Sequence, residues 1–219
     1  MEGFLSNSAL HYLEIAGTLV GLVYIYLQYK ASTHLWIANM IMSVIYIIVY
    51  LSQGIYAQCG INIYYVFAAI YGLLVWKFSK KPEEKEKPIT SASKKKLIIS
   101  SFACILICAA LISILYVMSN DAVAIAYTGN IFSYIKEFAV SNPTIFLDGI
   151  ATGMGIVALY FLAQKHKEHW LIWMATDAFA IALYLISELY FTAGLFVLYI
   201  ITSVAGYRKW IKLMNDAKA

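Results

Sequence analysis

The segment His169-Trp170-Leu171-Ile172-Trp173-Met174-Ala175-Thr176-Asp177 lies in a long apolar stretch near the C-terminus. At about 100° per residue, Trp170, Trp173 and Asp177 fall on one face of a helix. Two indole rings and a carboxylate on one face suit a flat organic cation, which aromatic faces attract and the acid pairs. An acid inside a membrane span costs roughly 2.5–3.5 kcal/mol, so it seldom faces lipid. The structural alternative is an acid bonded to a neighbouring helix beside tryptophans that anchor the membrane interface.

The whole composition agrees with a membrane protein. The 219 residues are 62% hydrophobic and 13% charged, with a mean hydropathy of +0.74. These values predict an all-α polytopic membrane protein whose main partner is the lipid bilayer, and they give no reason to expect a nucleic-acid partner. Residues 1–8 contain no Lys or Arg ahead of the first apolar run, so we expect no cleavable signal peptide.

Seven apolar segments are each long enough to cross a hydrocarbon core of about 30 Å. They are predicted at residues 9–30, 34–52, 56–78, 97–118, 143–165, 169–187 and 189–212. The resulting organisation is a first three-helix repeat (9–78), a Lys-rich cytoplasmic linker (79–96), an inverter helix (97–118), an external loop (119–142) and a second three-helix repeat (143–212). Lys136 and Glu137 argue against a further crossing within 119–142, and Asn142-Pro143 has the sequence of a helix start.

The positive charges fix the expected orientation. With seven spans, fifteen of the sixteen Lys and Arg residues fall on one side of the membrane, and Lys136 alone falls on the other. Because positive charge gathers in cytoplasmic loops, the N-terminus is predicted outside and the C-terminus inside.

A shift of 134 residues aligns the first three segments with the last three without a gap. The matched pairs include Gly21 with Gly155, Trp36 with Trp170, Gly72 with Gly206, and Trp76 with Trp210. Four crossings separate the two copies, so both run in the same direction. We therefore predict a parallel 3+1+3 repeat with a pseudo-two-fold axis along the membrane normal.

Transport sites often lie near the midplane between such repeats. Asp177 would lie about 15 Å deep at 1.5 Å per residue from Lys167. The first repeat has Asn39 and Ser43 where the second has Trp173 and Asp177. The predicted substrate-binding residues are Trp170, Trp173, Asp177, Trp36, Asn39, Asn62, Tyr65 and Tyr199. Glu14 and Asp148 either attract cations at an outer mouth or satisfy helix ends and Tyr hydroxyls.

The 3+1+3 layout, the repeated Gly, Tyr and Trp frame and the Trp170-x-x-Trp173-x-x-x-Asp177 run resemble the PnuC family of bacterial vitamin transporters. The resemblance implies a SWEET-like fold in the bacterial inner membrane and a substrate site lined by that Trp-Trp-acid motif. It also implies facilitated diffusion of an unphosphorylated vitamin, which a cytoplasmic kinase then traps. Family members are often trimers, so a homo-oligomer is expected.

The resemblance does not fix the substrate by itself. Residues 14–32 and 60–65 look most like thiamine-type members, and residues 36–39 lack the aromatic-Pro-Gly run common in nicotinamide riboside members. Thiamine is therefore the expected substrate and nicotinamide riboside the alternative, since both are flat aromatic monocations.

Two other classes of protein fit this sequence less well. An intramembrane enzyme is not expected, because the four histidines (His11, His34, His166 and His169) form no H-E-x-x-H set and no Gly-x-Ser-x-Gly motif occurs. Neither a cofactor nor a metal is expected, because Cys59, Cys104 and Cys108 form no metal-ligand pattern. Cys104 and Cys108 share a helix face at i and i+4 and are expected to be small packing residues. A membrane scaffold or sensor would leave Asn39, Asn62 and Asp177 without a reason to gather at the midplane.

Overall fold

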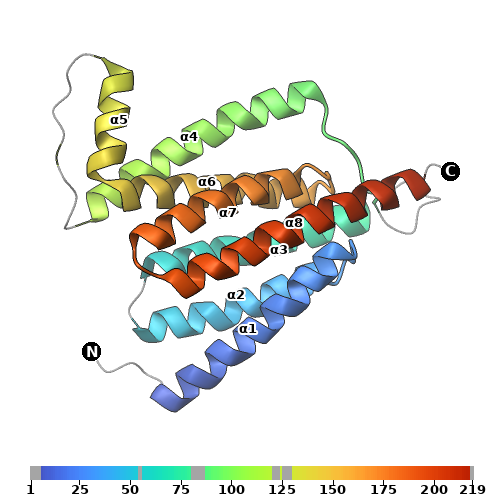
Figure 1. Ribbon diagram of the computed structural model, residues 1–219. Coiled ribbons are helices and arrows are strands. Elements are labelled where there is room, and N and C mark those ends of the chain that lie inside the picture. The colour runs from blue at the N-terminus through green and yellow to red at the C-terminus, as the bar shows by residue number, and fades with distance from the viewer. Residues whose placement is uncertain (1–5, 54–55, 80–86, 120–123, 125–129, 218–219) are drawn as a thin grey trace. The chain divides into compact units, whose positions relative to one another are not determined.

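The computed structural model describes residues 6–53, 56–79, 87–119, 124 and 130–217. These residues form eight helices and no strand longer than an isolated bridge (Figure 1). The helices are α1 (Asn7–Tyr29), α2 (Leu35–Gln53), α3 (Tyr56–Phe78), α4 (Lys94–Met118), α5 (Ile131–Ser141), α6 (Pro143–Ala163), α7 (His169–Ile186) and α8 (Tyr190–Asp216). The predicted all-α class is confirmed.

Six of these helices, α1 to α4, α6 and α7, are long and apolar enough to cross a membrane, as judged on the described residues. The seventh predicted segment is helical as α8, which continues into a charged C-terminal end. The count of seven crossings and their orientation stay predictions.

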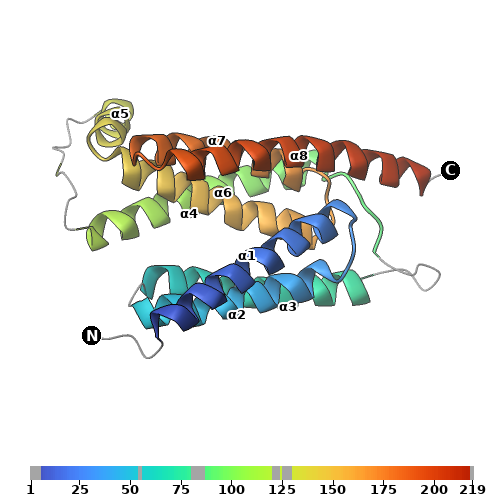
Figure 2. The same cartoon turned by 60° about the horizontal axis from the view of Figure 1, so that its bottom comes forward.

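Helix α5 differs from the sequence expectation, which had a loop at 119–142. The side-chain oxygen of Asn130 accepts hydrogen bonds from the backbone N–H groups of Phe132 and Ser133, and so caps the helix. Eleven residues span only about 16 Å, too short to cross a membrane. Within its unit α5 lies across the other helices (Figures 1 and 2). The loop prediction was wrong for these residues because a short amphipathic helix leaves no long apolar run.

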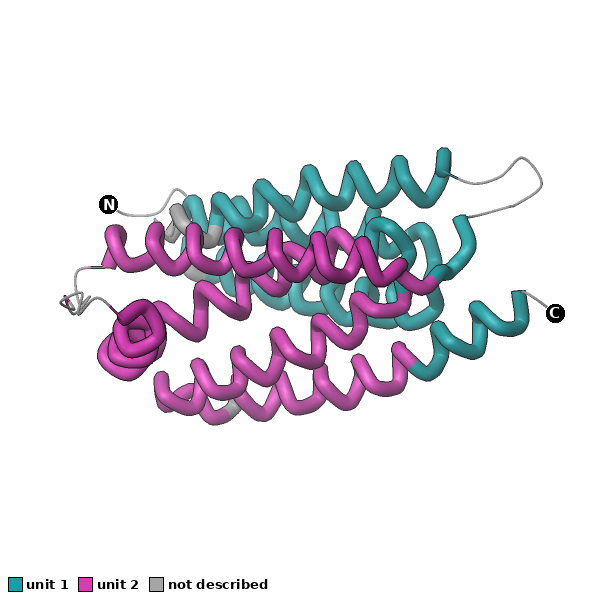
Figure 3. The backbone as a smooth tube through the Cα atoms, turned by 90° about the horizontal axis from the view of Figure 1, so that it is seen from above, with its two compact units in different colours: residues 1–90, 162–166, 208–219 teal, residues 91–161, 167–207 magenta. Residues whose placement is uncertain are grey.

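The chain divides into two compact units (Figure 3). Unit 1 holds residues 1–90, 162–166 and 208–219, and unit 2 holds residues 91–161 and 167–207. In unit 1, α2 packs against both α1 and α3. In unit 2, α4 packs closely on α6 at Gly149 and Gly153, where a Cβ atom would collide with Ile112 and Cys108 respectively. Such a pair of glycines four residues apart lets two membrane helices approach closely.

Two turns within unit 1 share a backbone geometry that is rare for residues other than glycine. Ala31, after α1, has φ of 54°, and Lys165, after α6, has φ of 58°. The N–H of Ala31 donates to the carbonyl of Gln28 at 3.0 Å, and the N–H of Lys165 donates to the carbonyl of Leu162 at 2.8 Å. The corresponding residues in the two turns are 134 positions apart.

Two tryptophans of unit 1 at equivalent positions of the predicted repeat each donate a hydrogen bond to the end of a helix in the other repeat. The Trp76 indole N–H donates to the carbonyls of Leu162 and Ala163, each at 3.1 Å. The Trp210 indole N–H donates to the carbonyl of Gln28 at 2.9 Å. The two rings also touch, with centroids 6.2 Å apart. Each tryptophan thus satisfies carbonyls in the last turn of a helix far away in sequence.

Candidate substrate-binding site

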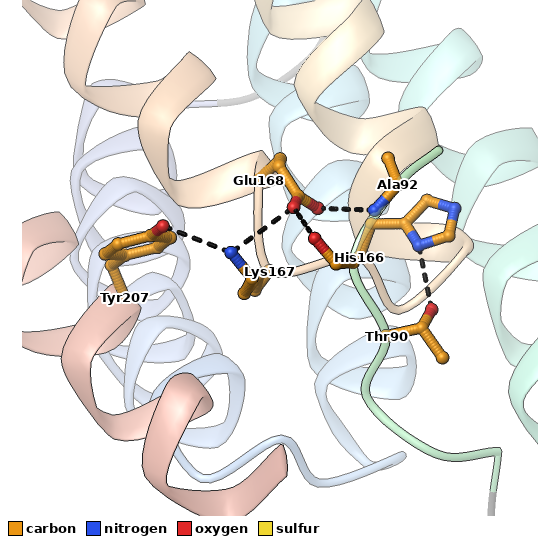
Figure 4. Close-up of polar contacts among 7 residues, drawn as sticks. Thr90, Ala92, His166, Lys167, Glu168 and Tyr207 are labelled. Carbon is orange, nitrogen blue, oxygen red and sulfur yellow. Dashed lines mark hydrogen bonds and ion pairs between the residues drawn. The ribbon is translucent and has the colours of Figure 1, made fainter. Parts of the chain in front are cut away.

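A charged network fixes the start of α7, the helix that carries the Trp-Trp-acid motif. The Glu168 carboxylate accepts hydrogen bonds from the Ser91 hydroxyl and the Ala92 N–H (Figure 4). The Lys167 ammonium lies 3.4 Å from that carboxylate and 3.2 Å from the Tyr207 hydroxyl of α8. Burial works to raise the pKa of Glu168, but these donors and the Lys167 charge outweigh it and leave the pKa lowered. The network therefore ties α7 to α8 and to the segment before α4.

Figure 4 also shows a second contact, which lies wholly within unit 1. The Thr90 hydroxyl is 2.8 Å from His166 Nδ1, and the Thr90 N–H donates to the carbonyl of Lys165 at 3.0 Å. The end of the linker is therefore bound to the turn that follows α6.

Trp170 is packed inside the protein. It is 3% exposed, and its ring lies against Gly206 of α8, where a Cβ atom would come within 2.5 Å of the ring. The ring of His169 lies beside it, tilted by 39°, with centroids 4.7 Å apart. This indole therefore fills the space between α7 and α8, and its geometry suits holding the helices more than contacting a solute.

One turn further on, three polar groups of α7 lie close together. Trp173 lies over Gly155 of α6, where a Cβ atom would be 3.6 Å from the ring. The Trp173 indole nitrogen and the Thr176 hydroxyl are buried and have no hydrogen-bond partner in the described chain. Asp177 is 5% exposed, and its carboxylate forms no ion pair or hydrogen bond with the described residues. Buried polar groups in native proteins are almost always paired, so this cluster marks a place where a solute can bind.

The predicted residues of the first repeat lie in unit 1. Trp36 is fully buried against Gly72 of α3, and a Cβ atom on that glycine would collide with its ring. The buried amide oxygen of Asn39 accepts a hydrogen bond from Ser43 at 3.3 Å. Asn62 is also buried.

The two predicted tyrosines have aromatic neighbours within their own units. The Tyr65 ring lies 5.8 Å from that of Tyr64 in unit 1, and the Tyr199 ring lies 5.3 Å from that of Phe196 in unit 2.

The two acids predicted for an outer mouth have different surroundings. Glu14 is exposed on α1, and Asp148 is half-buried on α6. The Asp148 carboxylate accepts a hydrogen bond from the Thr152 hydroxyl at 3.2 Å. Asp148 therefore has a partner within its own helix.

Sequence reasoning missed Thr176, although it precedes Asp177 and lies i+3 from Trp173. It also missed a cavity of about 950 Å³ in unit 2, which Ile172 and Phe179 line from another face of α7. None of the motif residues lines that cavity. The described residues contain no group of three or more His, Cys, Asp or Glu that could hold a metal ion.

Comparison with known proteins gives consistent matches. The family model described as nicotinamide mononucleotide transporter matches residues 11–212. The nicotinamide riboside transporter PnuC of Escherichia coli is 21% identical over 214 residues, covering 94% of this chain and 88% of the relative. The PnuC of Neisseria mucosa is 26% identical over 102 residues, covering 43% and 37%.

A crystal structure of the vitamin B3 transporter PnuC has the same fold. It matches with a TM-score of 0.63 and 18% identity over 94% of this chain and 83% of that one. The family model spans most of the sequence, and the predicted resemblance is confirmed: the chain belongs to the PnuC family of multi-pass vitamin transporters in the bacterial inner membrane.

Proposed function

We propose that this transporter takes up nicotinamide riboside. The relatives named above are nicotinamide riboside and vitamin B3 transporters, which supports this substrate over thiamine. No comparison supports the thiamine-type closeness that residues 14–32 and 60–65 suggested. The substrate expectation from sequence therefore gives way to its alternative.

The observation that carries the proposal is the partnerless polar cluster on α7. Nicotinamide riboside is a flat pyridinium cation that carries a carboxamide and ribose hydroxyls. The Trp173 ring offers an aromatic face to the cation, and Asp177 offers the opposite charge. The Thr176 hydroxyl and the Trp173 N–H can bond the polar edges of the solute. Such a ligand compensates the desolvation of the buried acid, which no described residue does.

We propose a role for each of the other predicted residues as well. Trp170 positions α7 against α8, because its ring is enclosed beside Gly206. Trp36, which was also expected to bind substrate, positions α2 against α3 in the same way, because its ring is enclosed beside Gly72. We propose that the remaining residues bind substrate, as expected from the repeat: Asn39, Asn62, Tyr65 and Tyr199. Glu14 and Asp148 stay candidates for the outer mouth, with Asp148 the weaker one because Thr152 already bonds it.

The proposed mechanism is passive alternating access by two parallel repeats, with the N-terminus outside. The matched turns at Ala31 and Lys165 support the repeat. So do the two indole hydrogen bonds, in which Trp76 donates to the carbonyl of Leu162 and Trp210 donates to that of Gln28. An exchange of bonds between equivalent residues is what a two-fold relation produces. Phosphorylation by a cytoplasmic kinase would make uptake one-way, and a homotrimer remains the expected assembly.

A tryptophan-fluorescence titration of the purified protein tests the substrate. Nicotinamide riboside is expected to quench the indole emission at lower concentration than thiamine, and Asp177→Ala is expected to abolish the response. Tighter binding of thiamine would overturn the substrate. An unchanged response in Asp177→Ala would overturn the site.

A further inference from the structure

Three tryptophans of unit 1 lie together near the ends of their helices. Trp36 is the second residue of α2, Trp76 lies two residues before the end of α3, and Trp210 follows Arg208 and Lys209 on α8. The centroid of the Trp76 ring lies 5.7 Å from that of Trp36 and 6.2 Å from that of Trp210. All three side chains are fully buried. We call these three residues the indole plug.

Full burial distinguishes the indole plug from an interfacial belt. A tryptophan that anchors a protein at the membrane surface places its ring among the lipid headgroups, so part of the ring lies outside the protein. The side chains of the plug have no exposed surface, and two of their N–H groups donate to backbone carbonyls of the chain. The plug therefore fills the interior at this end of unit 1.

The hydrogen bonds of the plug cross between the two predicted repeats. Trp76 belongs to the first repeat and donates to the carbonyls of Leu162 and Ala163 at the end of α6. Trp210 belongs to the second repeat and donates to the carbonyl of Gln28 at the end of α1. Each repeat therefore holds the other at this end, and the helix ends separate fully only when the bonds of both tryptophans break.

The end of the linker, residues 87–90, lies on the same helix ends. The N–H of Lys87 donates to the carbonyl of Trp76 at 3.5 Å. The hydroxyl of Thr90 lies 2.8 Å from Nδ1 of His166, in the turn after α6. This segment, which we call the strap, therefore connects the end of α3 to the turn after α6.

The plug lies between the polar residues of α2 and the positively charged end of unit 1. Asn39 lies about one turn beyond Trp36 along α2, and Ser43 lies about one turn further. In the turn after α6, the Lys165 ammonium lies 4.2 Å from the centre of the Trp76 ring. In the proposed orientation, the end that carries the lysines faces the cytoplasm. A solute at Asn39 therefore has the plug between itself and the cytoplasm.

We propose that the indole plug is the cytoplasmic gate of this transporter, that it is shut in this structure, and that the strap holds it shut. This role rests on the proposed transport function, because only a carrier has to release a solute at this end. Release requires Trp76 to leave the end of α6 and Trp210 to leave the end of α1. The bonds of the plug and the strap therefore stabilise the shut state and are absent from the state that is open to the cytoplasm.

Labelling of a cysteine behind the plug tests the gate. Ser43→Cys supplies the thiol in a chain whose three native cysteines are replaced by alanine, and a membrane-impermeant maleimide is added to inside-out vesicles without substrate. The further change Trp76→Phe/Trp210→Phe removes the indole bonds to both helix ends, so we expect this thiol to react about tenfold faster. Labelling from the outer side, in right-side-out vesicles, should stay the same or slow down. An unchanged rate from the cytoplasmic side, or faster labelling from both sides, overturns the gate.

The strap has a matched pair of variants. Thr90→Val removes the hydroxyl that bonds His166, whereas Ser93→Ala removes the cap of α4 and leaves the strap intact. We expect Thr90→Val to speed cytoplasmic labelling about threefold and Ser93→Ala to leave it unchanged. Equal rates in these two variants overturn the role of the strap. Because no substrate is added, unchanged labelling contradicts the gate alone, whereas failure of nicotinamide riboside to bind contradicts the proposed substrate alone.

Discussion

Helices α2 and α7 have the same frame but different chemistry one turn later. In each, a buried tryptophan lies on a glycine of the third helix of its half: Trp36 on Gly72 and Trp170 on Gly206. After Trp36, α2 places Asn39 and Ser43, which hydrogen-bond to each other. After Trp170, α7 places Trp173 and Asp177 at the equivalent positions, and neither the indole N–H nor the carboxylate forms a hydrogen bond with the described residues.

This difference separates the residues that hold the helices together from the polar groups that a solute would bind. A polar pair that satisfies itself, as in α2, is stable without a ligand. A buried acid beside an unbonded indole N–H is costly, and a protein keeps such a group where something else pairs it. We therefore expect the charged part of the substrate at α7, and changes there should cost more binding than changes in α2.

The largest effect is expected from Asp177→Asn. Loss of one partner of a desolvated charge pair costs roughly 2–5 kcal/mol, so the affinity for nicotinamide riboside should fall about thirtyfold or more. Isothermal titration calorimetry measures it. The control in α2 is Ser43→Ala, for which we expect a change in affinity of about twofold or less, because this substitution removes no charge. Equal losses in the two variants would contradict the asymmetry between the helices.

The two tryptophan–glycine contacts should contribute equally to the stability of the protein. Gly72→Ala and Gly206→Ala each insert a methyl group into a tryptophan ring, and overpacking of this kind costs about 1–3 kcal/mol. Thermal unfolding in detergent should show a similar loss for both. Gly194→Ala is the control, because nothing lies within 4 Å of a Cβ there. A loss in only one of the two would mean that the frame is not shared.

Trp173→Ala should weaken binding about tenfold, because a cation over an indole ring contributes up to roughly 2 kcal/mol when desolvated. Trp173→Phe keeps an aromatic face and should recover part of that loss. Fluorescence of the remaining tryptophans or calorimetry gives the affinity. If Trp173→Ala binds like wild type, the cation does not lie on this ring.

The indole hydrogen bonds of Trp76 and Trp210 in unit 1 allow a matched pair of variants. Trp76→Phe and Trp210→Phe each remove one indole N–H from a buried carbonyl contact, at a cost of about 1 kcal/mol. Thermal unfolding should show losses of similar size. A large loss for one and none for the other would argue against equivalent roles.

The sequence predicted the long helices well because their apolar runs are bounded by polar turns and by the Asn142-Pro143 start. It failed at α5, where Asn130 supplies a cap but the helix is too short for an apolar run to reveal it. The motif placed Trp170, Trp173 and Asp177 on one face. Their different surroundings depend on neighbouring helices: Gly206 encloses Trp170, and no described side chain forms a hydrogen bond or ion pair with the buried carboxylate of Asp177. The spacing of residues along one helix does not show which residues of other helices lie against it.

The smallest effect concerns how the two helices begin. The position of Glu168 corresponds to His34, whose Nδ1 lies 3.2 Å from the hydroxyl of Ser32, a local contact. Glu168 instead accepts hydrogen bonds from Ser91 and Ala92, and its pKa lies below the ordinary 4.5.

A lowered pKa of Glu168 in the folded protein means that its stabilisation is complete above pH 4.5 and is lost as the pH falls through the lower value. Glu168→Gln should therefore lose about 1 kcal/mol or less at neutral pH, because the amide oxygen of glutamine can still accept a hydrogen bond from Ser91 or Ala92. The difference in stability between Glu168→Gln and wild type should narrow in acid. Unfolding curves at pH 7 and pH 4 measure it, and a gap that stays constant would show that the Glu168 charge does not hold the start of α7.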